Sequence, residues 1–197
     1  MRAYFESFGC KVNQYETEII KSAFSSKGYE ITADPAMADV AVINSCTVTA
    51  SGDSKCLYSL RRLRKLNPDA VIVLTGCMPQ ASPNIAEKIP EADIVTGTKN
   101  RNRITTLVED FIENRNRTVS ILQYNSNDSF ENMACDGFND KTRAFVKIQD
   151  GCDQFCSYCI IPYARGRSRS KSIENIRKEV AELALNGHKE IVLVGIN

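Results

Sequence analysis

Continuous apolar runs alternate with segments of helical periodicity through the first part of the chain. The runs are typical of strands, and most are continuous enough to be buried on both faces of a sheet. They predict strands at residues 2–8, 38–45, 70–76, 92–98 and 118–124. Apolar residues recurring every three to four positions predict helices that contain residues 15–24, 56–65 and 104–112. Strands and helices that alternate in this way predict a parallel α/β sheet.

Local signals set the ends of two of these helices. Asn13 is followed three residues later by Glu16, which resembles a capping box and predicts that Asn13 caps the first helix. Gly28 is expected to end that helix, and Asn67-Pro68 is expected to stop the second.

Residues 125–142 are polar, rich in turn formers and aperiodic, which indicates a linker between domains. A strand at 143–151, a helix capped by Ser172 and an apolar strand at 190–197 follow it. We therefore predict a first domain at 1–124, the linker at 125–142, and a second, incomplete domain at 143–197. The last strand is apolar enough to need neighbours on both edges, so we expect the chain to be part of a longer protein.

Composition changes this picture little, except for the cysteines. The 197 residues are 43% hydrophobic and carry a formal net charge of +1, which gives no general attraction to nucleic acid or anionic membranes. No apolar run approaches the roughly 20 residues of a membrane span, and the first residues do not form a signal peptide, so we expect a cytoplasmic protein. The eight cysteines are therefore expected to be metal ligands, catalytic groups or buried small residues rather than disulfides.

Three cysteines occupy the same place in successive repeats. Cys10, Cys46 and Cys77 each follow a predicted strand and precede a helix. Ligands of an open parallel sheet collect outside the carboxyl ends of its strands, so we expect these thiols to converge there. Three thiolates are one short of the four ligands of a structural zinc, but they leave one iron of a [4Fe–4S] cluster open. The alternative is three small buried cysteines.

A second group of cysteines lies in the stretch GCDQFCSYCIIPYARG, residues 151–166. Cys152, Cys156 and Cys159 are close enough in sequence for one loop to wrap a second [4Fe–4S] cluster and leave one iron vacant. The alternative here is zinc with a fourth ligand from elsewhere in the chain.

These motifs resemble a known family. The second cysteine group, with Tyr158 before its last cysteine, is similar to the cluster motif of the radical S-adenosylmethionine enzymes. Together with FGCKVNQYE, VINSCTVT and LTGC it resembles the radical S-adenosylmethionine methylthiotransferases over essentially the whole chain. The stretch CKVNQYE resembles the motif of the branch that acts on N6-threonylcarbamoyladenosine at tRNA position 37.

The resemblance implies a flavodoxin-like or Rossmann-like domain followed by the first βαβ unit of a truncated radical enzyme (β/α) barrel. It implies two [4Fe–4S] clusters, an auxiliary one on Cys10, Cys46 and Cys77 and a radical-generating one on Cys152, Cys156 and Cys159. S-adenosylmethionine would bind the second cluster, with Tyr158 against its adenosyl group. Arg165 and the basic residues after it would contact the carboxylate of S-adenosylmethionine or tRNA phosphate. An electron donor such as flavodoxin or ferredoxin is implied as a partner, and a membrane is not.

Other functions remain open at this stage. Within the family, the substrate could be isopentenyladenosine in tRNA or an aspartate of a ribosomal protein. Outside enzymes, the chain could be a non-catalytic iron–sulfur module. Two further cysteines fit neither group: Cys56 is expected in the core of the second helix, and Cys135 is expected to be an incidental thiol in the linker. Solvent-exposed basic residues are expected along the second helix at Arg61, Arg62, Arg64 and Lys65.

Overall fold

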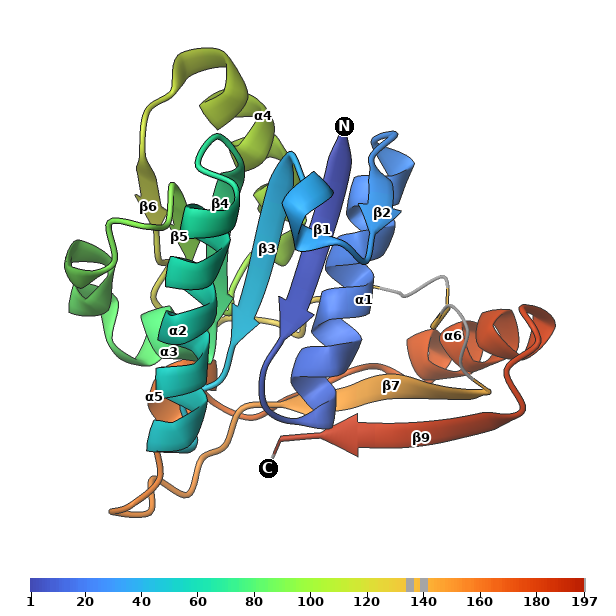
Figure 1. Ribbon diagram of the computed structural model, residues 1–197. Helices are drawn as coiled ribbons and strands as arrows, with labels where there is room; N and C mark the ends of the chain where they lie inside the picture. The colour runs from blue at the N-terminus through green and yellow to red at the C-terminus, as the bar shows by residue number, and fades with distance from the viewer. Residues whose placement is uncertain (134–136, 139–141, 197) are drawn as a thin grey trace.

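The structure is a computed structural model that describes residues 1–133, 137–138 and 142–196 (Figure 1). Its larger sheet is entirely parallel, with the strand order β2-β1-β3-β4-β5-β6. The strands are β1 (Arg2–Ser7), β2 (Glu30–Thr32), β3 (Val40–Ser45), β4 (Val71–Gly76), β5 (Ile94–Thr96) and β6 (Thr118–Ser120). This order extends the flavodoxin-like arrangement by one strand, and its direction reverses between β1 and β3. The five predicted strands are confirmed, and each is shorter than predicted.

Helices cover both faces of this sheet (Figure 1). They are α1 (Lys11–Ser26), α2 (Ala50–Leu66), α3 (Cys77–Ala81) and α4 (Ile104–Asn114), with the single-turn 3-10 segments η1 (Pro35–Met37) and η3 (Arg101–Arg103) and the longer η2 (Pro83–Lys88). Phe24 of α1 and Val108 of α4 pack against one face, and Leu60 and Leu63 of α2 pack against the other. Cys56 is fully buried beside Leu60, as predicted. None of the described helices is both long and apolar enough to cross a membrane.

The second segment forms a small mixed sheet. Its strands are β7 (Arg143–Asp150), β8 (Arg169–Ser170) and β9 (Glu190–Gly195), and its helices are α5 (Ile161–Arg165) and α6 (Ile173–Leu185). β7 is central, antiparallel to β8 and parallel to β9. The predicted Ser172 cap is confirmed, because the Ser172 hydroxyl accepts a hydrogen bond from the Asn175 N–H at 3.2 Å. The predicted last strand forms as β9, at the edge of the sheet, and its Leu193 is 55% exposed.

Helix α1 is shared by the two sheets. Its Val12, Tyr15 and Ile19 belong to one apolar cluster with residues of β7, α6 and β9. The segment predicted as a linker takes part as well, because Phe138 is buried and packs edge-on against Phe145 at a centroid distance of 5.4 Å. The described residues of 125–142 include no helix or strand, and Cys135 lies outside the described residues.

The predicted capping box at the start of α1 is wrong. Cys10, not Asn13, occupies the cap position, and no side chain caps the helix there. Asn13 lies in the first turn and is fully buried, and its amide donates to the carbonyl oxygens of Phe8 at 2.9 Å and Ser45 at 2.8 Å. Glu16 is also buried, and its carboxylate is paired with cations from three other elements. The two residues point into the interface between the sheets rather than back onto the backbone of α1.

Candidate functional site

The three strand-end cysteines follow neighbouring strands of the large sheet. Cys10 lies at the N-cap of α1, Cys46 comes directly after β3, and Cys77 is the first residue of α3 after β4. β1 pairs with β3 and β3 pairs with β4, and both pairs are parallel. All three thiols therefore stand at one carboxyl edge, beside the β1/β3 switch point where ligands of such sheets bind. Figure 1 shows this edge facing α5 and β7.

Two glycines allow the cysteine loops to approach one another. Gly9, before Cys10, has φ +99°, and a Cβ at this position would overlap the Cβ and Sγ of Cys46. Gly76, before Cys77, has φ +103°, and a Cβ there would overlap the Ser45 carbonyl and the Asn44 amide oxygen. A side chain at either position would thus meet both a strained backbone and a steric clash. The loops of Cys10 and Cys77 are consequently packed directly against the chain around Cys46.

The thiols of this group differ in their surroundings. Cys46 and Cys77 are 7% and 3% exposed, whereas Cys10 is exposed and lies 3.6 Å from the Asn13 amide oxygen. Burial raises the pKa of the Cys77 thiol to about 11, and the neighbouring guanidinium of Arg165 opposes this shift. Among the described residues, no three His, Cys, Asp or Glu side chains are already arranged to hold a metal ion. The donor chemistry nevertheless fits an iron–sulfur cluster, since thiolates are the ligands that such clusters take.

The second cysteine group lies in the loop between β7 and α5. Cys152 is 8% exposed, and its N–H donates to the Gly166 carbonyl at 3.1 Å. Cys156 and Cys159 are more accessible and close a turn, in which the Cys159 N–H donates to the Cys156 carbonyl at 2.9 Å. Gly151 repeats the pattern of the first group: its φ is +88°, and a Cβ there would overlap the Arg167 carbonyl.

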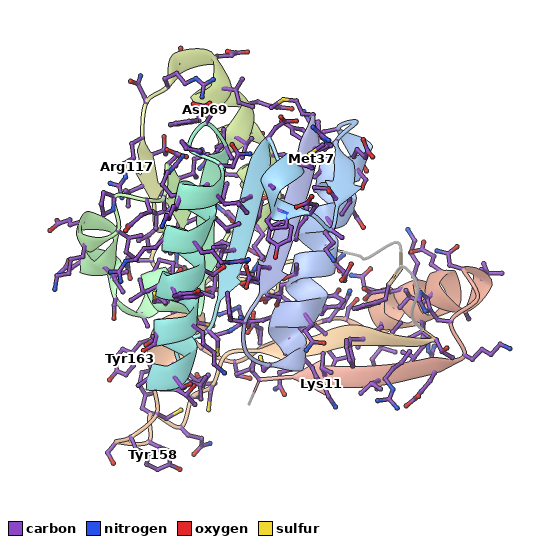
Figure 2. All side chains as sticks on the ribbon, in the orientation of Figure 1. Lys11, Met37, Asp69, Arg117, Tyr158 and Tyr163 are labelled. Atoms are coloured by element: carbon purple, nitrogen blue, oxygen red, sulfur yellow. The ribbon has the colours of Figure 1, made fainter. Side chains whose placement is uncertain are left out.

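Aromatic side chains surround this loop. Tyr158 is 90% exposed and projects from the loop tip, while Tyr163 lies on α5 (Figure 2). Phe155 packs edge-on against Tyr163 with a centroid distance of 6.0 Å, and the guanidinium of Arg167 lies 5.9 Å from the Phe155 ring centroid. The loop thus presents an accessible face with aromatic rings and one cation.

Arg165 is placed differently from an exposed ligand-binding arginine. Its side chain is fully buried and forms a two-point ion pair with Glu16, with Nη1–Oε1 and Nη2–Oε2 distances of 2.6 and 3.0 Å. Nη1 also donates to Asp150 at 3.2 Å, and Nη2 donates to the Asn13 amide oxygen at 2.7 Å. The side chain therefore connects the second cysteine loop to the start of α1.

A buried group of charges surrounds this contact. It comprises Glu16, Arg101, Lys147, Asp150 and Arg165, and we call it the interface charge cluster. Burial opposes ionisation of Glu16, but the cations of Arg101, Arg165 and Lys147 outweigh it and hold the pKa of Glu16 well below its usual value. Burial also opposes ionisation of Asp150, but the charges of Lys147 and Arg165 outweigh this effect and lower the pKa of Asp150. Both carboxylates are therefore charged at neutral pH.

The basic run from Arg165 to Lys171 divides between interior and surface. Lys171 is buried and ion-paired with Glu179, whose other oxygen accepts the Tyr15 hydroxyl at 2.7 Å. Arg167 is exposed and lies 3.6 Å from an Asp153 oxygen. The expectation of a uniformly solvated or ligand-facing run is therefore wrong for Lys171.

Along α2, the prediction of exposed basic residues holds for Arg61, Arg62 and Lys65. It is wrong for Arg64, which is anchored by Asp93 at 2.6 Å and by the Pro68 carbonyl at 2.7 Å. Beside the exposed residues, a groove of about 590 Å³ runs between the end of β1 and α2. Phe8, Lys55, Tyr58 and Arg62 are among the residues that line it, and Tyr58 is 70% exposed.

Sequence reasoning missed the interface charge cluster. Its members lie on α1, η3, β7 and α5, and each alone resembles an ordinary surface charge. The strongest signal was the apolar strand at 143–150, in which Lys147 interrupts a hydrophobic run. A charge at such a position indicates a buried partner.

Two family patterns match this chain in succession. The pattern described as "Uncharacterized protein family UPF0004" matches residues 2–97, and that of the "Radical SAM superfamily" matches residues 146–197. Among solved structures, a radical S-adenosylmethionine methyltransferase, TsrM, from Kitasatospora setae aligns with a TM-score of 0.62 at 13% identity. The alignment covers 98% of this chain and 47% of that one, and at this identity it shows the shared fold. The chain thus combines a UPF0004 domain with radical S-adenosylmethionine sequence.

Curated relatives narrow this class. The chain is 38% identical to "Threonylcarbamoyladenosine tRNA methylthiotransferase MtaB" of Aquifex aeolicus and 44% identical to the protein of that name from Bacillus subtilis. It is 36% identical to "tRNA-2-methylthio-N(6)-dimethylallyladenosine synthase" of Bacillus mycoides. These alignments cover 98–99% of this chain but 48%, 43% and 39% of the three relatives. The chain is similar over nearly its whole length to these radical S-adenosylmethionine methylthiotransferases, and it spans about half or less of their length.

Proposed function

We propose that this chain forms the part of a tRNA methylthiotransferase that holds two [4Fe–4S] clusters. The reaction is the S-adenosylmethionine-dependent methylthiolation of C2 of N6-threonylcarbamoyladenosine at tRNA position 37. The observation that carries the proposal is the placement of three cysteines at one sheet edge, facing the segment that bears the second cysteine group. The choice of substrate is supported by the relatives at 38% and 44% identity that are named for threonylcarbamoyladenosine.

Cys10, Cys46 and Cys77 would hold the auxiliary cluster, and Cys152, Cys156 and Cys159 would hold the second. When bound, the second cluster would supply the electron that cleaves S-adenosylmethionine to a carbon radical, and the auxiliary cluster would supply the sulfur. No ordinary acid or base among the side chains can activate the C2–H bond of adenine, so cofactor chemistry is required.

The protein's own residues would shape this site. Asn13 fixes the start of α1 beside Cys10 through its bonds to Phe8 and Ser45. Tyr158, accessible at the loop tip, would lie against the adenosyl group of S-adenosylmethionine. Arg165 would act from the protein interior, because its guanidinium is hydrogen-bonded to Glu16, Asp150 and Asn13.

The RNA substrate is expected in the groove beside α2. Phe8 lies two residues before Cys10 in sequence, so the groove leads toward the auxiliary cluster site. An exposed aromatic ring between cations suits single-stranded nucleic acid, whose bases stack while the cations face phosphate. We further propose that the protein acts in the cytoplasm, where tRNA is modified, with flavodoxin or ferredoxin as the electron donor.

Anaerobic reconstitution tests the proposal. Iron and sulfide are quantified and EPR spectra recorded for the 197-residue chain and for its Cys10→Ala and Cys156→Ala variants. We expect two reduced cluster signals in the unaltered chain and the loss of a different one in each variant. Zinc in place of iron would overturn the two-cluster assignment.

A second measurement separates the enzyme from a non-catalytic iron–sulfur module. The dithionite-reduced full-length protein is expected to form 5′-deoxyadenosine from S-adenosylmethionine. Methylthiolation of tRNA bearing N6-threonylcarbamoyladenosine, compared with tRNA bearing isopentenyladenosine and with a ribosomal protein, then decides the substrate.

A further inference from the structure

One donor of Arg165 has no partner in the interface charge cluster. A guanidinium offers five N–H donors. Four of them are accounted for, since Nη1 binds Glu16 and Asp150 while Nη2 binds Glu16 and Asn13. The fifth, on Nε, is buried and meets no acceptor among the described residues. Arg165 is the last residue of α5, and α5 packs against α3, which begins at the strand-end cysteine Cys77. The guanidinium also influences the Cys77 thiol electrostatically.

We propose that Arg165 is a positioning residue for the auxiliary cluster. Its unpartnered Nε–H would be available to a sulfur of the cluster site, and its positive charge would lie close to the thiolates that hold the cluster. This inference rests on the proposed function, because it needs a cluster on Cys10, Cys46 and Cys77. Arg165 belongs to α5, directly after the second cysteine loop, so one side chain links the two cofactor sites.

The charge balance around Arg165 supports this role. The fully buried members of the cluster are three cations, Arg101, Lys147 and Arg165, and two carboxylates, Glu16 and Asp150. A further carboxylate, Glu131, is partly exposed and offsets the charge of Arg101 rather than that of Arg165. A buried excess of positive charge is costly unless an anion compensates it. A cluster held by the thiolate of Cys77 would supply such an anion beside Arg165.

Asn13 extends the same contact to a second cysteine. Its amide oxygen accepts a hydrogen bond from Arg165 Nη2 at 2.7 Å and lies 3.6 Å from the Cys10 sulfur. Arg165 would therefore influence the Cys77 sulfur by its charge and the Cys10 sulfur through the side-chain amide of Asn13. Positive charge and hydrogen bonds near the sulfurs stabilise the reduced form of an iron–sulfur cluster, which carries one more negative charge.

The test measures the reduction potential of the auxiliary cluster by EPR-monitored titration. The Cys156→Ala chain serves as background, so that the auxiliary cluster is measured alone. In this background Arg165→Met is expected to lower the ratio of reduced to oxidised cluster about tenfold at a fixed potential, or about 59 mV. Glu16→Gln removes a negative charge and is expected to move the potential in the opposite direction.

Arg101→Gln is the matched control. Arg101 is buried and paired with the same Glu16, but it lies on η3, whereas Arg165 lies on α5, which packs against the helix that begins at Cys77. Its replacement should therefore shift the potential less than Arg165→Met does. General loosening of the interface would shift all three variants in one direction, whereas the proposal requires opposite signs for Arg165→Met and Glu16→Gln.

The outcomes separate this inference from the function on which it rests. If the background chain binds no iron at Cys10, Cys46 and Cys77, the proposed function fails. If the cluster loads but Arg165→Met leaves its potential unchanged, only the role of Arg165 is overturned. If Arg165→Met does not fold, Glu16→Gln and the charge-retaining Arg165→Lys decide. A raised potential in Glu16→Gln supports the role of the charge. A lowered potential in Arg165→Lys, which keeps the charge but lacks the guanidinium Nε–H, supports the role of that donor, and an unchanged potential in both variants overturns the role.

Discussion

At the scale of single residues, glycines set how closely the cysteine loops can approach. Gly9, Gly76 and Gly151 each precede a cysteine of the proposed cluster sites, and each has a positive φ. At all three positions a Cβ would overlap atoms of another segment of the chain. A glycine before a cysteine is here a packing requirement as well as a conformational one.

Gly9→Ala is expected to reduce both stability and iron binding. The positive φ alone costs about 1–2 kcal/mol for a residue with a side chain, and the added methyl group would also displace the Cys46 sulfur. Iron content after reconstitution of the Cys156→Ala background and urea denaturation measure the two effects.

Gly28→Ala provides the control for strain alone. Gly28 also has a positive φ, +83°, but a Cβ there would meet nothing within 4 Å. Equal losses of stability and iron in both variants would show that Gly9 is required for its conformation only and not for the contact with Cys46.

Glu16→Gln is expected to destabilise the fold by about 3–5 kcal/mol at pH 7, because it leaves buried cations without their carboxylate. Urea denaturation of the variant and the unaltered chain measures this difference. Glu18→Gln serves as the control, since the ion-pair partner of Glu18 among the described residues is the neighbouring Lys21. There we expect a loss of no more than about 1 kcal/mol.

The effect of Glu16 is also expected to depend on pH. Its pKa in the folded protein is lowered from an ordinary 4.5, so its stabilising contribution is present above pH 4.5 and declines as the pH falls. The stability gap between Glu16→Gln and the unaltered chain should therefore narrow below that pH. A gap that stays constant down to acid unfolding would contradict the ion-pair explanation.

At the scale of elements, predictions from the local sequence pattern succeeded where every residue of an apolar run is buried. The runs that became β3 and β4 are apolar without interruption, and both are buried along their whole length. β2 escaped prediction because it is a short, mostly exposed edge strand of sequence EIT. Asn13 and Glu16 matched a local capping motif, but their partners lie on η3, β7 and α5. Lys147 within an apolar run indicates a buried partner, but the sequence does not say which residues, so distant along the chain, supply it. The composition of the interface charge cluster could therefore not be predicted.

Helix α2 offers a prediction about RNA. Tyr58→Ala is expected to weaken binding of an anticodon stem-loop by at least fivefold, because loss of one stacked base costs about 1–3 kcal/mol. Fluorescence anisotropy with labelled RNA measures this change. Tyr58→Phe keeps the ring and should bind as the unaltered chain does, so weakened binding by the Phe variant would argue for a hydroxyl contact instead of stacking.

At the scale of the whole molecule, α1 joins the two sheets through two different faces of one helix. Ile19 packs with β7, α6 and β9, whereas its neighbour Ile20 packs with the large sheet. Both are aliphatic residues of the same size, and they are 5% and 1% exposed. Substitution of each tests whether the sheets can separate.

Ile19→Ala is expected to speed hydrogen exchange in β7 and β9 while β3 and β4 keep their protection, and Ile20→Ala is expected to do the reverse. Each loses about 2–5 kcal/mol of packing, and the loss should appear first in the sheet that the side chain contacts. Exchange measured by mass spectrometry resolves the two sheets. Equal acceleration throughout in both variants would mean that the interface charge cluster binds the sheets into one cooperative unit. In that case the two cysteine groups could not move apart without global unfolding. Selective acceleration would instead mean that the second cysteine loop can separate from the strand-end cysteines while the large sheet stays folded.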